Sequence, residues 1–168
     1  MKFGPNILKS TTTVRFQDCD PFGHLNNARY INYFLNARQD QVASYYDFEI
    51  MKFGAQPTES WLVSKTQIGY LAPAALMEVV SIQTRLIHAT ESQLLVEGIM
   101  MDQAEQRIKS LCWMEFTYVS LRTGKPATHP EALMQLFNTV RVSDGVNIND
   151  FNSRLAELRT SRVKTPAV

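Results

Sequence analysis

Apolar and polar residues alternate through much of the second half of the chain, with the two-residue period of β-strands. This alternation predicts four strands, over residues 61–71, 78–89, 92–102 and 107–121. The breaks between the last three strands are short, which favours an antiparallel meander. A further alternating segment, residues 11–17, predicts one strand near the N-terminus.

Residues 27–46 have the apolar spacing of an α-helix of about five turns. The apolar positions with this spacing are Ile31, Phe34, Leu35, Val42 and Tyr45. Further alanine and tyrosine residues flank this stripe, which suits a helix wrapped by a curved sheet better than one lying on a flat sheet. Residues 47–60 form a mixed connection, and short helices are predicted over residues 130–140 and 149–159. The order of these elements predicts an α+β fold.

With 168 residues, of which 45% are hydrophobic, the chain is long enough for one domain with a substantial core. Its net charge of +1, with acids and bases interspersed, argues against a nucleic-acid or polybasic membrane surface. Cys19 and Cys112 lie far apart and indicate no disulfide framework. The first residues lack the apolar core of a signal peptide, and the longest apolar run is far shorter than a membrane span. We therefore expect a cytoplasmic protein with no membrane partner.

Candidate chemistry gathers between the first strand and the long helix. The polar side chains found there within ten residues are Asp18, Asp20, His24, Asn26 and Asn27. A carboxylate at the start of a helix lies near backbone N–H groups that have no helical partner. Such a carboxylate can act on a carbonyl as base or nucleophile while the N–H groups hold the developing oxyanion.

Other chemistries fit this segment poorly. A calcium loop is excluded because Phe22 stands where an acid or amide is required, and Arg29 stands at the closing glutamate position. A zinc site would need a second pair of ligands at the usual spacing. Cys19 lies between two carboxylates, which disfavour its thiolate. The sequence has no glycine-rich phosphate loop, and His88 and His129 are expected to be surface groups.

The same segment, continued into the long helix, resembles the signature of the 4-hydroxybenzoyl-CoA thioesterase branch of the hotdog-fold acyl-CoA thioesterases. The residues that carry the resemblance are Phe16-x-Asp18-x-Asp20-x-x-Gly23-His24-Leu25-Asn26-Asn27-x-x-Tyr30-x-x-Tyr33-Phe34-x-x-Ala37-Arg38, and further on Ile68-Gly69-Tyr70-Leu71-Ala72-Pro73-Ala74. One further feature departs from the family pattern, and another distinguishes between the hotdog branches. Met77-Glu78 stands where the family usually has Gly-Asp, and the helix lacks the glutamate that a different hotdog branch uses for catalysis. The second feature points to the branch that carries its acid in the loop.

The resemblance implies a hotdog fold, a curved antiparallel five-stranded sheet wrapped around one long central helix. We expect this domain over residues 7–140 and a C-terminal helical extension over residues 141–168. The family relation also implies hydrolysis of an acyl-CoA or acyl-carrier-protein thioester without a metal or organic cofactor. It further implies a homodimer or homotetramer with active sites at the subunit interface.

The family's catalytic acid aligns with Asp20, which would act as nucleophile or as general base. Asp18 is interpreted as an anchor of the loop. The backbone N–H of Asn27 is the candidate oxyanion donor. His24 either orients the thioester or bonds only to the backbone, and both interpretations remain open. The residues expected to border the substrate are Phe22, Asn26 and Tyr30.

Two alternative functions remain open. One is a hotdog module that binds acyl thioesters without turnover, because the departure at Met77-Glu78 indicates an atypical pocket. The other is a hotdog hydratase or dehydratase, which is disfavoured because the Asp-x-Asn-Pro-x-His loop of those enzymes is absent.

Arg38, on the long helix, is interpreted as a core or interface residue.

Overall fold

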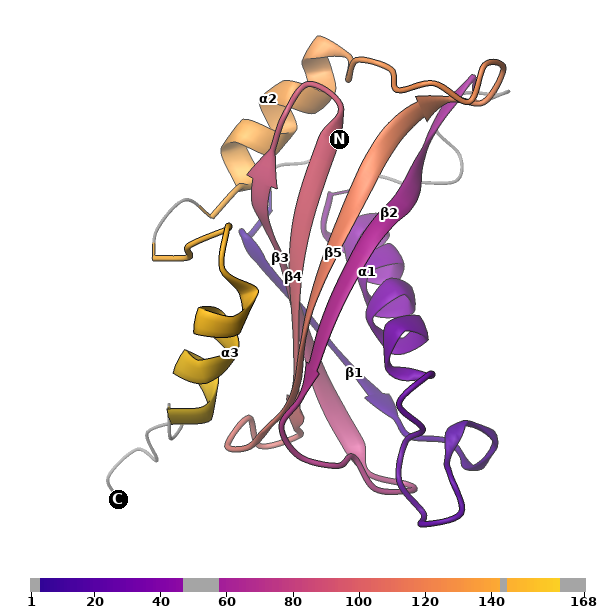
Figure 1. Cartoon of the computed structure of the whole chain (residues 1–168), viewed down its shortest axis with the longest axis vertical. Coiled ribbons are helices and arrows are strands. Elements are labelled where there is room, and N and C mark those ends of the chain that lie inside the picture. The colour runs from indigo at the N-terminus through magenta and orange to yellow at the C-terminus, as the bar shows by residue number, and fades with distance from the viewer. Residues whose placement is uncertain (1–3, 47–57, 143–144, 161–168) are drawn as a thin grey trace.

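The computed structural model describes residues 4–46, 58–142 and 145–160. Five strands form one antiparallel sheet in the order β1-β3-β4-β5-β2 (Figure 1). The strands are β1 (Ile7–Thr13), β2 (Glu59–Tyr70), β3 (Val79–Ala89), β4 (Gln93–Asp102) and β5 (Ile108–Ser120). The predicted meander of the last three strands is confirmed.

The long helix α1 (Tyr30–Tyr46) packs against one face of this sheet (Figure 1). Phe34 is fully buried in this contact, and a Cβ atom on Gly98 of β4 would lie 2.5 Å from its ring. A glycine at this crossing therefore lets the helix and the strand approach closely. The helix α2 (Glu131–Val140) adds Leu133 and Leu136 to the same core. The α+β hotdog architecture expected from the sequence is confirmed.

A third helix, α3 (Phe151–Thr160), covers the opposite face of the sheet and lies on the other side from α1 (Figure 1). The rings of Phe151 and Trp113 pack edge to face, with centroids 5.4 Å apart. Leu155 packs onto the bare Cα of Gly69, where a Cβ atom would lie 2.6 Å from the leucine methyl groups. The outer face of the sheet therefore carries a second hydrophobic core.

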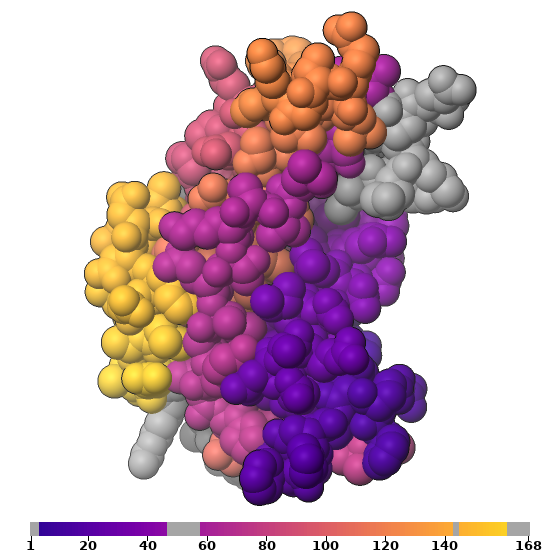
Figure 2. Space-filling view, turned by 45° about the vertical axis from the view of Figure 1, so that its right-hand side comes forward, coloured from indigo at the N-terminus to yellow at the C-terminus, as the bar shows by residue number. Residues whose placement is uncertain are grey.

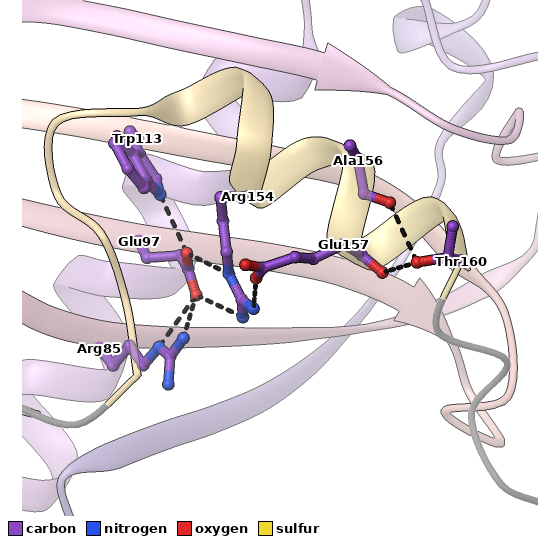
Figure 3. Close-up of polar contacts among 7 residues, drawn as sticks. All are labelled: Arg85, Glu97, Trp113, Arg154, Ala156, Glu157 and Thr160. Carbon is purple, nitrogen blue, oxygen red and sulfur yellow. Dashed lines mark hydrogen bonds and ion pairs between the residues drawn. The ribbon is translucent and has the colours of Figure 1, made fainter.

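A buried carboxylate, Glu97 of β4, joins α3 to the sheet and is only 1% exposed (Figure 3). It accepts hydrogen bonds from Arg85 Nε (2.9 Å), Trp113 Nε1 (2.9 Å) and Arg154 Nε (3.1 Å). Burial alone would raise the pKa of Glu97, but the hydrogen bond from Arg154 and the charge of Arg85 hold this pKa below its ordinary value. An ion-pair network as well as apolar packing therefore holds α3 in place.

Three predicted boundaries near the N-terminus are wrong. The first strand spans Ile7–Thr13 instead of residues 11–17, and residues 16–18 form a 3₁₀ turn in which the Cys19 N–H donates to the Phe16 carbonyl (3.1 Å). The long helix begins three residues later than predicted. Its start is delayed because residues 27–29 form a turn and the Asn26 side chain accepts the Ala28 N–H (2.9 Å).

The alternation of β2 shifts phase along the strand. A bulge between Val63 and Lys65 adds a residue, so Trp61 and Ile68 pack into the same core although their positions differ in parity. Residues 47–57 of the predicted connection lie outside the described residues.

His129 is also placed differently from the prediction, because it is buried rather than at the surface. Its Nε2 accepts a hydrogen bond from Trp61 Nε1 (3.0 Å), and its Nδ1 lies 3.1 Å from the Thr90 carbonyl oxygen. Burial lowers the pKa of His129, and these partners fit the neutral ring with its proton on Nδ1.

None of the described helices has the length and apolar character needed to cross a membrane.

Candidate active site

The loop between β1 and α1 is fixed by its own backbone. The Asp20 N–H donates to the His24 carbonyl (2.8 Å), and the Gly23 N–H donates back to the Asp20 carbonyl (3.0 Å). Gly23 adopts a φ of +75°, which a glycine tolerates without strain. The Asn26 N–H donates to the Asp18 carbonyl (2.9 Å) and closes the base of the loop. The candidate carboxylate thus sits in a tight turn.

A second segment, residues 71–78, forms the opposite wall of the site. The Leu25 N–H donates to the Ala74 carbonyl (2.8 Å), and the Leu76 N–H donates to the Gly23 carbonyl (2.9 Å). Figure 2 shows the indigo N-terminal segment lying against the magenta segment that includes β2. The loop and this wall are therefore joined by backbone hydrogen bonds.

An ion pair supports this wall at the point where the sequence departs from the family pattern. Lys109 Nζ lies 2.7 Å from Glu78 Oε1 and donates to the Pro73 carbonyl (3.0 Å). Met77 adopts a φ of +65°, a conformation that favours glycine. The family's usual Gly-Asp would thus suit this turn, and Met77 occupies the glycine conformation despite its side chain.

The loop, the start of α1 and the second segment surround an open cavity of about 300 Å³. Four of the predicted site residues line this cavity, namely Asp20, His24, Asn27 and Tyr30. The other two do not. Phe22 is 83% exposed, and the Asn26 side chain accepts the Ala28 N–H at the base of the loop.

Tyr70 also lines the cavity, although the sequence analysis placed it in a strand and in the second segment of the family resemblance without expecting it at the site. Its hydroxyl donates to the Asn27 carbonyl (2.9 Å), and its ring packs edge to face on Tyr30, with centroids 5.1 Å apart. The Tyr30 hydroxyl in turn accepts the Ala74 N–H (3.2 Å), and burial raises the pKa of Tyr30. The two tyrosines therefore brace the start of α1 against the second segment.

The two aspartates of the loop differ in how many of their carboxylate oxygens have a partner. Asp20 Oδ1 accepts the N–H groups of Phe22 (2.9 Å) and His24 (3.2 Å), whereas Oδ2 has no partner among the described residues. Asp18 Oδ2 accepts the Tyr33 hydroxyl (2.9 Å), and its Oδ1 lies 3.8 Å from Arg29 Nε. Asp20 is thus held by one oxygen at the edge of the cavity, while both Asp18 oxygens face partners.

The Asn27 N–H lies in the turn before α1 and donates to no acceptor in the part of the chain that the structure describes. It lies at the N-terminal end of α1, where unpaired N–H groups create a positive potential. A carbonyl oxygen in the cavity could therefore accept this hydrogen bond while its carbon faces Asp20.

The neighbouring thiol is less suited to chemistry. Partial burial, together with the charges of Asp20 and Asp18, raises the pKa of Cys19. A raised pKa leaves little thiolate at neutral pH. Within residues 4–46, 58–142 and 145–160, no group of three or more histidine, cysteine or acidic side chains could hold a metal ion.

The five-stranded antiparallel sheet packed on one long helix places the chain in the class of hotdog-fold proteins. The chain belongs to the thioesterase-like superfamily, whose family model matches residues 14–137. The match begins just after β1, covers α1, the four strands β2 to β5 and most of α2, and ends before α3.

Individual relatives are distant in sequence. The chain is 23% identical over 118 residues to the long-chain acyl-CoA thioesterase FadM of Escherichia coli (strain K12), covering 70% of this chain and 87% of FadM. Among solved structures, it resembles a DHNA-CoA thioesterase from Staphylococcus aureus, with a TM-score of 0.73 at 14% identity, covering 80% of this chain and 90% of the other. It also resembles Slr0204, a 1,4-dihydroxy-2-naphthoyl-CoA thioesterase from Synechocystis, with a TM-score of 0.70 at 13% identity. This match covers 80% of this chain and 94% of Slr0204.

Proposed function

We propose that this protein hydrolyses the thioester of an acyl-CoA or acyl-carrier-protein substrate to the free acid and a thiol. The observation that carries the proposal is that Asp20, whose Oδ2 has no partner among the described residues, lines the same cavity as Asn27, whose N–H is unpaired there. Family membership supports the reaction type, and FadM, a relative, is a long-chain acyl-CoA thioesterase.

In this proposal Asp20 supplies the reacting carboxylate. It either removes a proton from the water that attacks the thioester carbon, or attacks that carbon itself to form an anhydride that water then cleaves. In both routes the bond from the carbonyl carbon to sulfur breaks, and the sulfur leaves as a thiolate that takes up the proton given up by the attacking water. The two backbone hydrogen bonds to Oδ1 fix the carboxylate before the substrate arrives.

The oxyanion that forms on the thioester oxygen would be stabilised by the Asn27 N–H. One such donor contributes on the order of 10²–10³ in kcat. Tyr70 positions this group, because its hydroxyl bonds the Asn27 carbonyl (2.9 Å) and so holds the turn. His24 lines the same cavity and is proposed to orient the thioester.

The test is thiol release from a panel of acyl-CoA substrates by the wild type, Asp20→Asn and Asp18→Asn. Asparagine at position 20 retains an acceptor for the Phe22 and His24 N–H groups while removing the charge and basicity. We expect Asp20→Asn to lower kcat by about 10²-fold or more with little change in KM. Asp18→Asn is the matched control and should mainly lower stability, by roughly 0.5–2 kcal/mol, as lost caps do. Normal turnover by a folded Asp20→Asn variant would contradict the assignment.

We further propose that the chain acts as a homodimer or homotetramer. In the described part of the chain, β2 is an edge strand twelve residues long, and Leu62 on it is 54% exposed. A long edge strand with exposed apolar residues is an association surface unless a partner covers it. The exposed Phe22 lies in the loop beside the cavity, where a second subunit could cover it. Light scattering at micromolar concentration should give at least twice the chain mass, and a monomer would refute the assembly.

A further inference from the structure

A second cavity, of about 100 Å³, lies between the later part of α1, the strands β2, β4 and β5, and the helix α2. Nine of its ten lining residues are apolar or aromatic, including Val42, Trp61 and Phe137. The tenth is Arg38. Arg38 is half-buried, and a guanidinium without a counter-charge on the wall of an apolar cavity is unusual, because charges largely removed from water are normally paired.

Arg38 has a single hydrogen-bond partner, Thr84, whose Oγ1 accepts from Nη1 (3.2 Å). No carboxylate pairs with it within the described ranges. Arg85 and Arg154, by contrast, share Glu97. Burial lowers the pKa of Arg38 to about 10, so the group remains charged at neutral pH.

The other donors of Arg38 remain reachable. Among the described residues, Ser110 Oγ is the sole side-chain nitrogen or oxygen atom that is fully buried without a hydrogen-bond partner. The unpaired guanidinium nitrogens are therefore accessible, and the cavity is a space that Arg38 borders. A guanidinium offers a planar fork of N–H donors that matches the two oxygens of a carboxylate.

This cavity is distinct from the one beside Asp20, because the two share no lining residue. On α1, Tyr30 belongs to the first cavity and Arg38 to the second, eight residues or about 12 Å further along the helix. Phe34 lies between them, fully buried and packed against Gly98. The two cavities are therefore separated along α1 by a buried side chain.

We propose that this cavity binds a small apolar monocarboxylate, with its carboxylate on Arg38 and its hydrocarbon group among the apolar lining residues. The volume of about 100 Å³ suits a short alkyl chain, since it is smaller than the engineered apolar cavity of about 150 Å³ that holds benzene in another protein. The carboxylate supplies the missing counter-charge, and the apolar group replaces empty space.

Isothermal titration calorimetry with hexanoate as the probe and hexanol as its uncharged analogue tests this proposal. The wild type should bind hexanoate at least tenfold more tightly than hexanol. Arg38→Gln should abolish that preference, whereas Arg38→Lys should retain part of it because the charge remains. Asp20→Asn should bind hexanoate as the wild type does. The tryptophan emission of Trp61, which lines the cavity, provides a second readout.

Any of four results would overturn the proposal. The first is equal affinity of the wild type for hexanoate and hexanol, including no binding of either at millimolar concentrations. The second is a tenfold preference for hexanoate that survives in Arg38→Gln. The third is loss of hexanoate binding in a folded Asp20→Asn variant, which would place the carboxylate in the other cavity. If Arg38→Gln does not fold, the wild-type comparison and Arg38→Lys still decide, because a lysine variant that binds both probes equally also refutes the pairing.

Discussion

Replacing Glu97 by glutamine should strongly destabilise the fold, although this residue does not line the cavity of the proposed active site. Two guanidinium groups and the Trp113 indole N–H all donate to the Glu97 carboxylate. The side chains of Arg85 and Arg154 are only 16% and 17% exposed, so water can replace their counter-ion only in small part. Glutamine keeps the shape, but it removes the charge and turns one acceptor into a donor.

The magnitude follows from the burial of the network. Removing one partner of a buried ion pair costs about 3–5 kcal/mol, because the remaining charge stays buried without compensation. Glutamine still offers one acceptor oxygen, so we expect a loss of stability at the lower end of this range, about 3 kcal/mol. For a chain of this length such a loss lowers Tm by about 6–12 °C. Arg154→Met should cost less, because Glu97 then keeps Arg85.

Urea unfolding at one fixed protein concentration, followed by circular dichroism, measures the difference. Lys9→Met is the matched control, because the Lys9–Glu105 pair (2.7 Å) is largely exposed and should contribute less than about 1 kcal/mol. A loss below about 1 kcal/mol for Glu97→Gln would refute the reasoning. The wild type should also lose stability as pH falls below about 4.5, the ordinary glutamate value. The depressed pKa of Glu97 contributes stability only above that value, and this contribution disappears as the pH falls through the lowered folded pKa.

Two further outcomes follow from single residues. Met77→Gly should raise the free energy of unfolding by about 0.5–1 kcal/mol. The substitution relieves a left-handed φ that costs roughly 1–2 kcal/mol, but part of this gain is lost because glycine has more conformational entropy in the unfolded chain. Unchanged or lower stability in denaturant titrations would count against strain at Met77. The lowered pKa of His129 should make the wild type lose stability as pH falls below about 6.5 toward the folded pKa, since the buried ring must gain a proton. His129→Gln should remove this part of the pH dependence between about pH 7.5 and 5.5, and a slope unchanged by that substitution would show that another group titrates.

Periodicity in the sequence predicts most elements, because strands and helices that bury one face must repeat their apolar residues. It fails where a local hydrogen bond or an inserted residue competes with the pattern. The Asn26 side chain delays the start of α1. The bulge after Val63 exchanges the faces of the sheet toward which odd- and even-numbered side chains of β2 point. Neither feature has a distinctive residue type in the sequence.

Long-range burial is harder to predict from the sequence. Glu97 lies next to Val96 in the predicted strand, so the alternation places it on the face opposite the core, where water is expected. That face is covered by a helix whose Arg154 is 57 residues further along the chain. His129 is buried for a similar reason, through Trp61 at a separation of 68 residues. In the loop, the resemblance singled out Asp20, but its free oxygen is a property of the folded turn.

The position of α3 limits how copies of this chain can meet. Two bare sheets could stack face to face about 10 Å apart, but here α3 occupies that space above Trp113 and Gly69. A neighbouring copy approaching this side would touch the helix instead of the strands. Among the described strands, the unpaired backbone groups of the sheet remain along β1 and β2. Assembly by continued strand pairing is therefore lateral, and a chain truncated before Phe151 would expose an apolar surface prone to unspecific stacking.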